Sequence, residues 1–316
     1  MATPKIPRGV SSVRLDGTLA AIGGGQIRIP LKKESLMADH QVLIAVSQTY
    51  AGVPTSVDVR RFITDMSVET SDGRRAFVTG YQAYDLGRYP SQGTPGQSNA
   101  LAATSTSDFS FHINHANEGA LYDLFSAIPA GTLTTFDLVI NFAADNANGF
   151  IGGTVPGVAS YTATARSEGY PSLSGQPWVG KMRHVIERVM QTGTAGAGTS
   201  YDLRLVAGNL TRYLMLHTFD TTGATPSPSD SILNNLRLTI DGEEKRITTF
   251  SGTRMKNAGK MRFDIVGCAV LDFGDDESGW LDLRNVNEPK ISVDIASGAP
   301  ASYLITLAQD YNTLMA

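Results

Sequence analysis

Short runs in which apolar and polar residues alternate recur along most of the chain, and turn-forming residues separate them. The clearest example is residues 66–80, MSVETSDGRRAFVTG, where an alternating segment enters an Asp-Gly pair at 72–73 and an apolar segment follows. Strict alternation predicts a strand with one buried face, and Asp-Gly suits a tight hairpin turn because both residues tolerate positive φ. The same pattern returns in residues 236–252, LRLTIDGEEKRITTFSG. A repeated hairpin suggests a duplicated fold.

Other segments of the first half also match segments of the second half in the same order. The six further pairs are 26–31 with 201–206, 42–48 with 213–219, 109–113 with 262–266, 118–124 with 277–283, 136–143 with 289–296, and 159–164 with 301–306. The spacing between matches shrinks only where loops are expected. Seven colinear matches therefore indicate a tandem duplication.

The duplication predicts an all-β protein of two tandem eight-stranded jelly-roll β-sandwiches with a few short helices. The chain has 316 residues, enough for two domains of about 150 residues, each with its own core. We expect four parts along the chain. They are an extended N-terminal arm at 1–25, a first jelly roll at 26–168, a linker at 169–198 and a second jelly roll at 199–316.

Helical spacing occurs at two places. Residues 117–127, NEGALYDLFSA, predict a short helix that ends before Pro129. Residues 179–191, VGKMRHVIERVMQ, place apolar side chains at helical spacing and predict an amphipathic helix in the linker. That helix either packs its apolar stripe on one domain or lies on a membrane surface. Residues 85–107 are rich in Gly, Pro, Ser and Thr, which predicts a long surface excursion.

Composition narrows the possible functions. The net charge is −4 and the isoelectric point is near 5.7, so there is no overall basic field for nucleic acid. The single cysteine, Cys268, allows no internal disulfide. No apolar run reaches the length of a membrane span. The N-terminal residues lack the apolar core of a secretory signal, so we expect the protein to be made and used in the cytoplasm.

Motifs of catalysis are missing from the sequence. There is no nucleophile elbow, phosphate-binding glycine loop or His-Glu-x-x-His zinc motif. His112 and His115 lie on a predicted strand, where we expect them to point to opposite faces and not to share a metal. Two carboxylate pairs could be imagined as a catalytic acid and base, but no spacing favours that role over ordinary surface charge. These pairs are Glu69 with Asp72 and Glu118 with Asp123. We therefore expect no enzyme activity and assign no catalytic or cofactor-binding residue.

One acidic cluster is a weak candidate for a structural cation. It consists of Asp272, Asp275, Asp276 and Glu277 in the sequence LDFGDDESG. Carboxylate oxygens gathered in a glycine-containing loop could hold Ca²⁺. The cluster lacks the regular alternation of a known calcium loop, and the alternative is a solvated acidic turn.

The second half carries a resemblance to a known family. The hairpin LRLTIDGEEKRITTFSGTRM and the later segment ESGWLDLRNVNEPKISVDIASGAPASYLITL resemble the double jelly-roll major capsid proteins of tailless icosahedral viruses with an internal membrane, the corticovirus and tectivirus lineage. The resemblance extends from about Gln26 to the C-terminus. The segments 85–107 and 179–191 do not match it residue by residue.

The resemblance implies a structural coat protein in the virion of a bacteriophage. Such a protein trimerises into pseudo-hexagonal capsomers that tile an icosahedral shell over an internal membrane. The implied partners are two further copies of the chain, neighbouring capsomers, vertex and minor capsid proteins, and the lipid membrane. No direct contact with nucleic acid is implied, because lipid lies between coat and genome.

The competing interpretation is a binding module, such as a phage receptor-binding or spike protein or a lectin-like β-sandwich. Its only support is an aromatic group near Asp85, made of Tyr81, Tyr84 and Tyr89, which could line a ligand site on a loop. The same tyrosines could instead pack the loop. A β-sandwich hydrolase is a third and weaker possibility.

Overall fold

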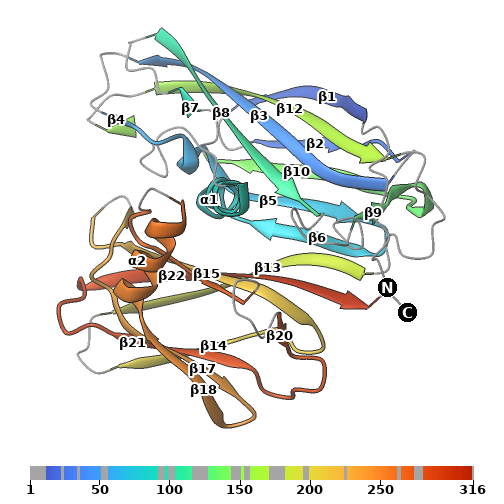
Figure 1. The fold of residues 1–316 in the computed structure, drawn as a ribbon. Coiled ribbons are helices and arrows are strands. Elements are labelled where there is room, and N and C mark those ends of the chain that lie inside the picture. Colours follow the sequence, from blue (N-terminus) through green and yellow to red (C-terminus); the bar gives the residue numbers. More distant parts are fainter. Residues whose placement is uncertain are drawn as a thin grey trace. The chain divides into compact units, whose positions relative to one another are not determined.

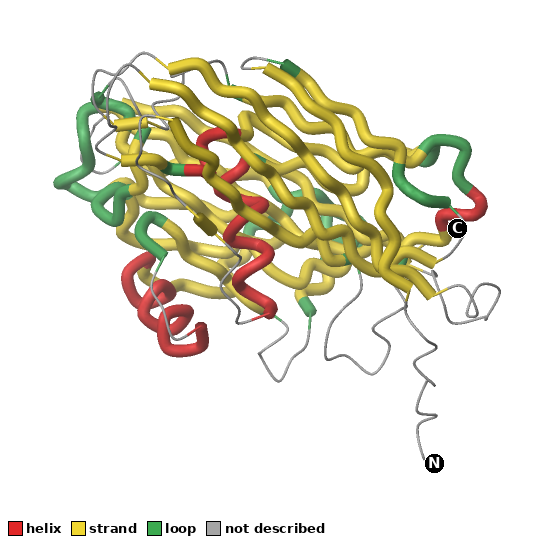
Figure 2. The backbone as a smooth tube through the Cα atoms, turned by 90° about the horizontal axis from the view of Figure 1, so that it is seen from above, coloured by secondary structure: helices red, strands yellow, loops and turns green. Residues whose placement is uncertain are grey.

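The computed structural model describes residues 12–22, 25–33, 36–50, 56–91, 97–98, 104–115, 127–143, 151–152, 157–170, 182–194, 199–223, 226–261, 265–273 and 280–314. The chain divides into two compact units. One comprises Met1–Val185 and Leu314–Ala316, and the other comprises Ile186–Thr313. Strands make up most of the described backbone, and helices are few and short (Figure 2). The predicted all-β class is confirmed.

The first unit is built from two antiparallel sheets (Figure 1). One sheet has the order β1 (Ser12–Ile22), β12 (Gly157–Tyr170), β3 (Leu36–Tyr50), β8 (Thr104–Asn114), with β7 (Gln97–Ser98) and β9 (Ile128–Pro129) at its margins. The other has the order β2 (Gln26–Pro30), β10 (Phe136–Phe142), β5 (Ile63–Thr70), β6 (Gly73–Val78), and β13 (Met182–Thr194) begins beside β6. The remaining elements are β4 (Ser56–Val57) paired with β11 (Ile151–Gly152), the short 3-10 helices η1 (Val59–Phe62) and η3 (Ala130–Thr132), and α1 (Gly80–Ser91).

The second unit repeats this plan. Its first sheet has the order β13, β22 (Ser302–Leu314), β15 (Leu210–Asp220), β19 (Cys268–Asp272), and β16 (Ser227–Pro228) and β20 (Leu281–Asp282) also pair with β15. Its second sheet has the order β14 (Ser200–Arg204), β21 (Lys290–Ile295), β17 (Leu233–Ile240), β18 (Glu243–Thr249). The helix α2 (Phe250–Met261) follows β18 as α1 follows β6. Each unit therefore has two four-stranded sheets in the strand order of a jelly roll.

Alternation along the strands explains how each sandwich closes. In the first unit, a row of three apolar side chains crosses the sheet at Ile29, Leu138 and Val68, and all are buried. The second unit has the corresponding row Leu203, Ile291 and Leu238, also buried. Burying one such side chain contributes about 1.5–3 kcal/mol, so a one-residue slip that exposed a whole row would be strongly unfavourable.

The two hairpins correspond, but with an offset of one residue. A β-bulge follows Val68 in the first and Leu238 in the second, which aligns the strands. The two-residue turns are then 71–72 and 241–242, so the Asp-Gly pairs themselves are not equivalent. Both turn residues of the second hairpin have positive φ, at 49° and 84°, as a type I′ turn requires. The first hairpin has its positive φ only at Gly73, the first residue of the returning strand.

The amphipathic helix predicted for residues 179–191 is wrong. Residues 182–194 form β13, and the boundary between the two units falls inside this strand. Its buried residues are consecutive, from His184 to Ile186, and Met190 of the supposed apolar stripe is 47% exposed. Pairing within the sheets, together with β-branched side chains such as Val185 and Ile186, outweighs the helical spacing.

Several expected boundaries also differ. The arm predicted for 1–25 contains β1 from Ser12, which pairs with β12 over its whole length. The excursion predicted for 85–107 contains the end of α1, β7 and the start of β8. The sequence pattern missed α2, and Ile265 and Val266 of the expected strand 262–266 are not in a strand. The helix predicted for 117–127 lies outside the described residues except for Ala127.

Gly80 and Gly259 give a matched pair of tests in the two helices. A Cβ on Gly80 would lie 2.1 Å from the carbonyl oxygen of Arg60, whereas one on Gly259 would meet nothing within 4 Å. We expect Gly80→Ala to lower the free energy of unfolding by about 1–3 kcal/mol and Gly259→Ala to raise it by about 0.5–1 kcal/mol. Urea denaturation followed by circular dichroism measures both, and equal midpoints for the two variants would contradict the structure.

Candidate functional site

Asp58, Arg60, Arg61 and Tyr81 form a polar cluster where η1 meets α1, called here the Asp58 cluster. Asp58 caps η1 by accepting a hydrogen bond from the Arg60 backbone N–H at 3.1 Å. The Arg60 guanidinium donates to both carboxylate oxygens at 3.0 and 3.1 Å, and the Tyr81 hydroxyl donates to one of them at 2.7 Å. Arg61 Nε donates to that hydroxyl at 2.9 Å. Each of the four side chains therefore has a hydrogen-bond partner within the cluster.

Burial and charge oppose each other in the Asp58 cluster. Burial would raise the pKa of Asp58, but the hydrogen bonds and positive charge of Arg60 outweigh it and lower the pKa. Burial also raises the pKa of the Tyr81 hydroxyl above its usual range, so the hydroxyl stays protonated and remains a donor. The cluster thus fastens η1 to α1, and it offers no group poised to react.

The tyrosines proposed as a ligand-binding group do not line an open loop. Tyr81, Tyr84 and Asp85 lie in α1 and are buried. The Arg60 guanidinium stacks 4.4 Å from the Tyr81 ring centre and 5.9 Å from that of Tyr84. The side chain of Tyr89 lies outside the described residues. The loop-packing interpretation is therefore right for Tyr81 and Tyr84, and the binding-module hypothesis loses their support.

The acidic cluster is described only at Asp272, because Asp275, Asp276 and Glu277 lie outside the described residues. Asp272 ends β19, and its carboxylate accepts a hydrogen bond from Lys260 of α2 at 2.8 Å. A cation at this carboxylate would have to share it with the lysine ammonium. Calcium binding by the cluster stays a prediction.

A buried histidine pair was not predicted. His115 Nδ1 lies 3.1 Å from His184 Nδ1, and the rings meet edge to face. The helical spacing of residues 179–191 predicted His184 on a helix, so this contact could not be anticipated. One ring must donate and the other accept for this hydrogen bond to form. The side chain of His112 lies outside the described residues.

The carboxylates considered as acid and base are held by arginines. Glu69 pairs with Arg28 at 2.8 Å, and Asp72 accepts from the buried Arg75. Glu118 and Asp123 lie outside the described residues. Both described carboxylates therefore have structural partners, which fits the expected absence of catalytic residues without testing it.

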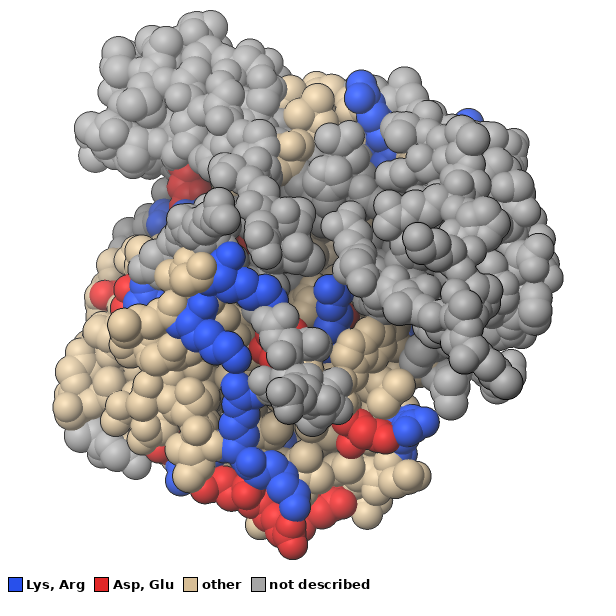
Figure 3. Space-filling view, viewed as in Figure 1, with Lys and Arg blue, Asp and Glu red and all other residues tan. Residues whose placement is uncertain are grey.

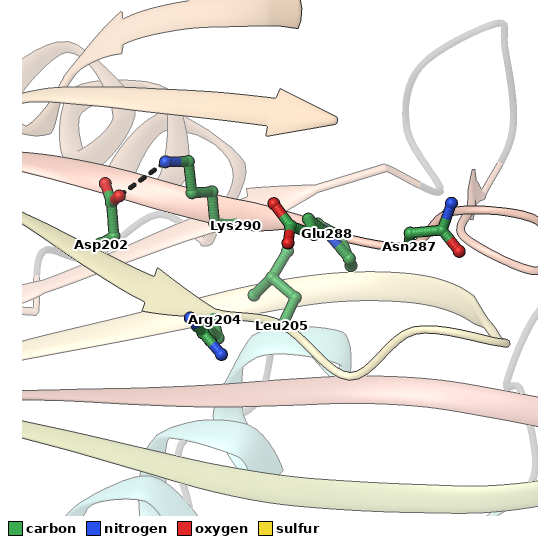
Figure 4. A pocket seen from close by; sticks show the side chains of 7 residues that line it. Asp202, Arg204, Leu205, Asn287, Glu288 and Lys290 are labelled. Atoms are coloured by element: carbon green, nitrogen blue, oxygen red, sulfur yellow. Dashed lines mark hydrogen bonds and ion pairs between the residues drawn. The ribbon is translucent and has the colours of Figure 1, made fainter. Parts of the chain in front are cut away.

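A polar pocket of about 440 Å³ lies on the second unit, at the ends of β14 and β21 (Figure 4). Its lining residues are Asp202, Arg204, Leu205, Asn287, Glu288, Pro289 and Lys290. Lys290 donates to Asp202 at 2.6 Å across the wall, and this contact and the Ser292 hydroxyl lower the pKa of Asp202. Two of the charged residues that line the pocket, Asp202 and Lys290, therefore pair with each other.

Ion pairs on the two repeated sheets occupy equivalent places with opposite charge. In the first unit Arg28 of β2 pairs with Asp137 of β10 at 2.8 Å. In the second unit the equivalent positions, fixed by the matching buried rows, are Asp202 and Lys290. Both units therefore have an ion pair at this place, but the acidic and the basic residue have exchanged strands. At the bottom of Figure 3, acidic and basic side chains lie next to each other. Figure 1, drawn from the same side, shows β17 and β18 of the second unit at this place.

No protein-family model and no curated protein sequence matches the chain. Solved structures do match it over nearly the full length. The major capsid protein of STIV, the Sulfolobus Turreted Icosahedral Virus, has a TM-score of 0.72 and 14% sequence identity, with 97% of each chain covered. The PBCV-1 virus capsid has a TM-score of 0.60 and 11% identity, with 96% of this chain and 93% of that chain covered. The chain has the double jelly-roll fold.

The major capsid protein of bacteriophage PM2 shares this double jelly roll, with a TM-score of 0.59 and 9% identity, and 97% of this chain and 98% of that chain are covered. The expected fold of tandem jelly rolls is therefore confirmed. In the part of the double jelly roll that the structure describes, no helix is long and apolar enough to cross a bilayer.

The Asp58 cluster predicts an acid-sensitive contribution to stability. Asp58→Asn should lower the free energy of unfolding at neutral pH by about 1–3 kcal/mol, because it removes one partner of a largely buried ion pair. Since the pKa of Asp58 is lowered by folding, its contribution is complete above the unfolded pKa of about 4 and is lost as pH falls through the folded pKa.

Thermal unfolding of wild type and variant between pH 7 and pH 3 tests this expectation. The two midpoints should converge as the pH falls. Asp282→Asn is the control, because Asp282 pairs with Arg284 at the surface and should matter several-fold less. An equal loss of thermal stability in both variants at neutral pH would show that the Asp58 cluster contributes no more than a surface ion pair.

Proposed function

We propose that this protein is a major capsid protein whose copies assemble into the icosahedral shell of a virus. The observation that carries the proposal is the pair of equivalent jelly rolls in one chain, matched over nearly the full length of viral capsid proteins from three sources. The pattern of polar contacts adds independent support.

Four carboxylates among the described residues are held by structural partners. Asp58, Asp72, Glu69 and Asp202 all accept from basic or hydroxyl partners. A coat protein needs a stable fold and contacts between copies, and it needs no reactive group. An enzyme would be expected to place unpaired titratable groups together in a pocket.

The unit of assembly in this proposal is a homotrimer. Three copies of a chain with two similar domains present six similar units, which gives a nearly hexagonal tile that packs closely in a shell. Neighbouring capsomers, vertex and minor capsid proteins would then be its protein partners. An internal membrane would lie beneath the shell. The protein would be made in the host cytoplasm and would be located in the virion.

Native mass spectrometry of the purified full chain tests the trimer. We expect a species with three times the 33.7 kDa mass of one chain, and it should persist on dilution if the trimer is the building block. Negative-stain electron microscopy should show three-fold tiles or closed shells. Monomer alone at every concentration, with no particles, would overturn the proposal.

A further inference from the structure

The polar pocket at the ends of β14 and β21 contains two charged side chains that its other charged residues do not pair with. Two acids and two bases line it, namely Asp202, Glu288, Arg204 and Lys290. The Lys290 ammonium turns toward Asp202 and pairs with it at 2.6 Å (Figure 4). Within the described residues, the Arg204 guanidinium and the Glu288 carboxylate have no ion pair or side-chain hydrogen bond. One guanidinium and one carboxylate therefore remain for a ligand.

Register in the sheet places Arg204 beside a second base. Arg204 of β14 lies directly opposite Lys290 of β21, and Lys290 lies opposite Thr239 of β17. Like charges directly opposite each other in a sheet are unfavourable. Lys290 is relieved by its contact with Asp202, whereas Arg204 has no acidic partner among the described residues. The row therefore favours an added negative charge beside Arg204.

Hydrogen bonds within the second unit hold the pocket wall in place. The backbone N–H groups of Asn287 and Glu288 both donate to one carboxylate oxygen of Asp241, at 3.0 and 3.2 Å. The Leu205 N–H donates to the Pro289 carbonyl at 2.9 Å. A wall that is already ordered lowers the entropic cost of binding a ligand.

Charge and size select the class of ligand. The four charged lining residues sum to zero, so a ligand with one negative charge fits better than a phosphate monoester, whose charge of about −1.5 to −2 would face two carboxylates. A guanidinium such as that of Arg204 binds a carboxylate through two parallel hydrogen bonds. The Glu288 carboxylate accepts from hydroxyl groups, and the Asn287 amide can donate and accept. The volume of about 440 Å³ lies within the range of small-molecule sites.

We propose that this pocket binds a sugar that carries one carboxylate, such as a uronic acid. Arg204 pairs with the carboxylate of the sugar, and Glu288 and Asn287 contact its hydroxyl groups. Leu205 and Pro289 supply apolar surface for the ring. A guanidinium stays protonated at neutral pH, so the unpaired groups suit binding and not proton transfer. This binding activity goes beyond the proposed coat function and does not depend on it.

Saturation-transfer NMR with the purified full chain tests the site. The probe is D-glucuronic acid, titrated to saturation. D-glucose provides the ring without the carboxylate, and acetate provides the carboxylate without the ring. The variants are Arg204→Gln and Glu288→Gln. Arg284→Gln is the matched control, because Arg284 is another exposed arginine of the second unit, pairs with Asp282 and does not line the pocket. Circular dichroism checks that every variant is folded.

We expect saturable binding of glucuronic acid and weaker binding of glucose and acetate. Arg204→Gln should raise the dissociation constant of glucuronic acid about tenfold or more, because it removes a charge-assisted contact. Glu288→Gln should raise it about threefold to tenfold, because the ligand hydroxyl groups lose a charged acceptor. Arg284→Gln should leave it unchanged.

The direction of the Glu288→Gln effect separates a sugar site from a simple anion site. Removing a negative charge strengthens the binding of a simple anion, so tighter binding of glucuronic acid and acetate by this variant would overturn the inference. Equal affinity for glucuronic acid and either glucose or acetate would also overturn it. The same holds for the lack of a saturable signal, or for an equal loss in Arg284→Gln. The coat function would stand in each case, because native mass spectrometry tests the trimer separately.

Discussion

Burial of one face of every strand against the facing sheet is the constraint on which both jelly rolls depend. Rows such as Ile29–Leu138–Val68 and Leu203–Ile291–Leu238 fix the register of their sheets, because a one-residue slip would turn them to the opposite face. Register in turn sets the position of everything attached to the strands. The β-bulges, the turns and the helices that follow β6 and β18 recur in both units for this reason.

Polar contacts add to the stabilisation that apolar burial provides. The Asp58 cluster connects η1 with α1, and Lys260 of α2 reaches Asp272 of β19. In both units a helix that follows the hairpin is thus tied by an ion pair or hydrogen bond to a neighbouring element. Groups used in this way are not available for chemistry.

The sequence predicted the duplication and the all-β class because strand alternation and turn residues are local signals. It failed where tertiary context decides. Residues 182–194 have helical spacing, yet strand pairing makes this segment a strand. The contact of His115 with His184 depends on that strand and could not be found without it. The Asp-Gly pairs revealed the repeat, although the bulges show that the pairs themselves are one residue out of register.

Reversed polarity in the equivalent ion pairs has a consequence for folding. Two similar domains in one chain risk exchanging strands while they fold. If β2 paired with β21 in place of β10, Arg28 would face Lys290, and β14 beside β10 would bring Asp202 against Asp137. Like charges opposite each other in a sheet are destabilising, whereas both native pairings are attractive. These two ion pairs therefore favour β2 beside β10 and β14 beside β21 over the exchanged pairings.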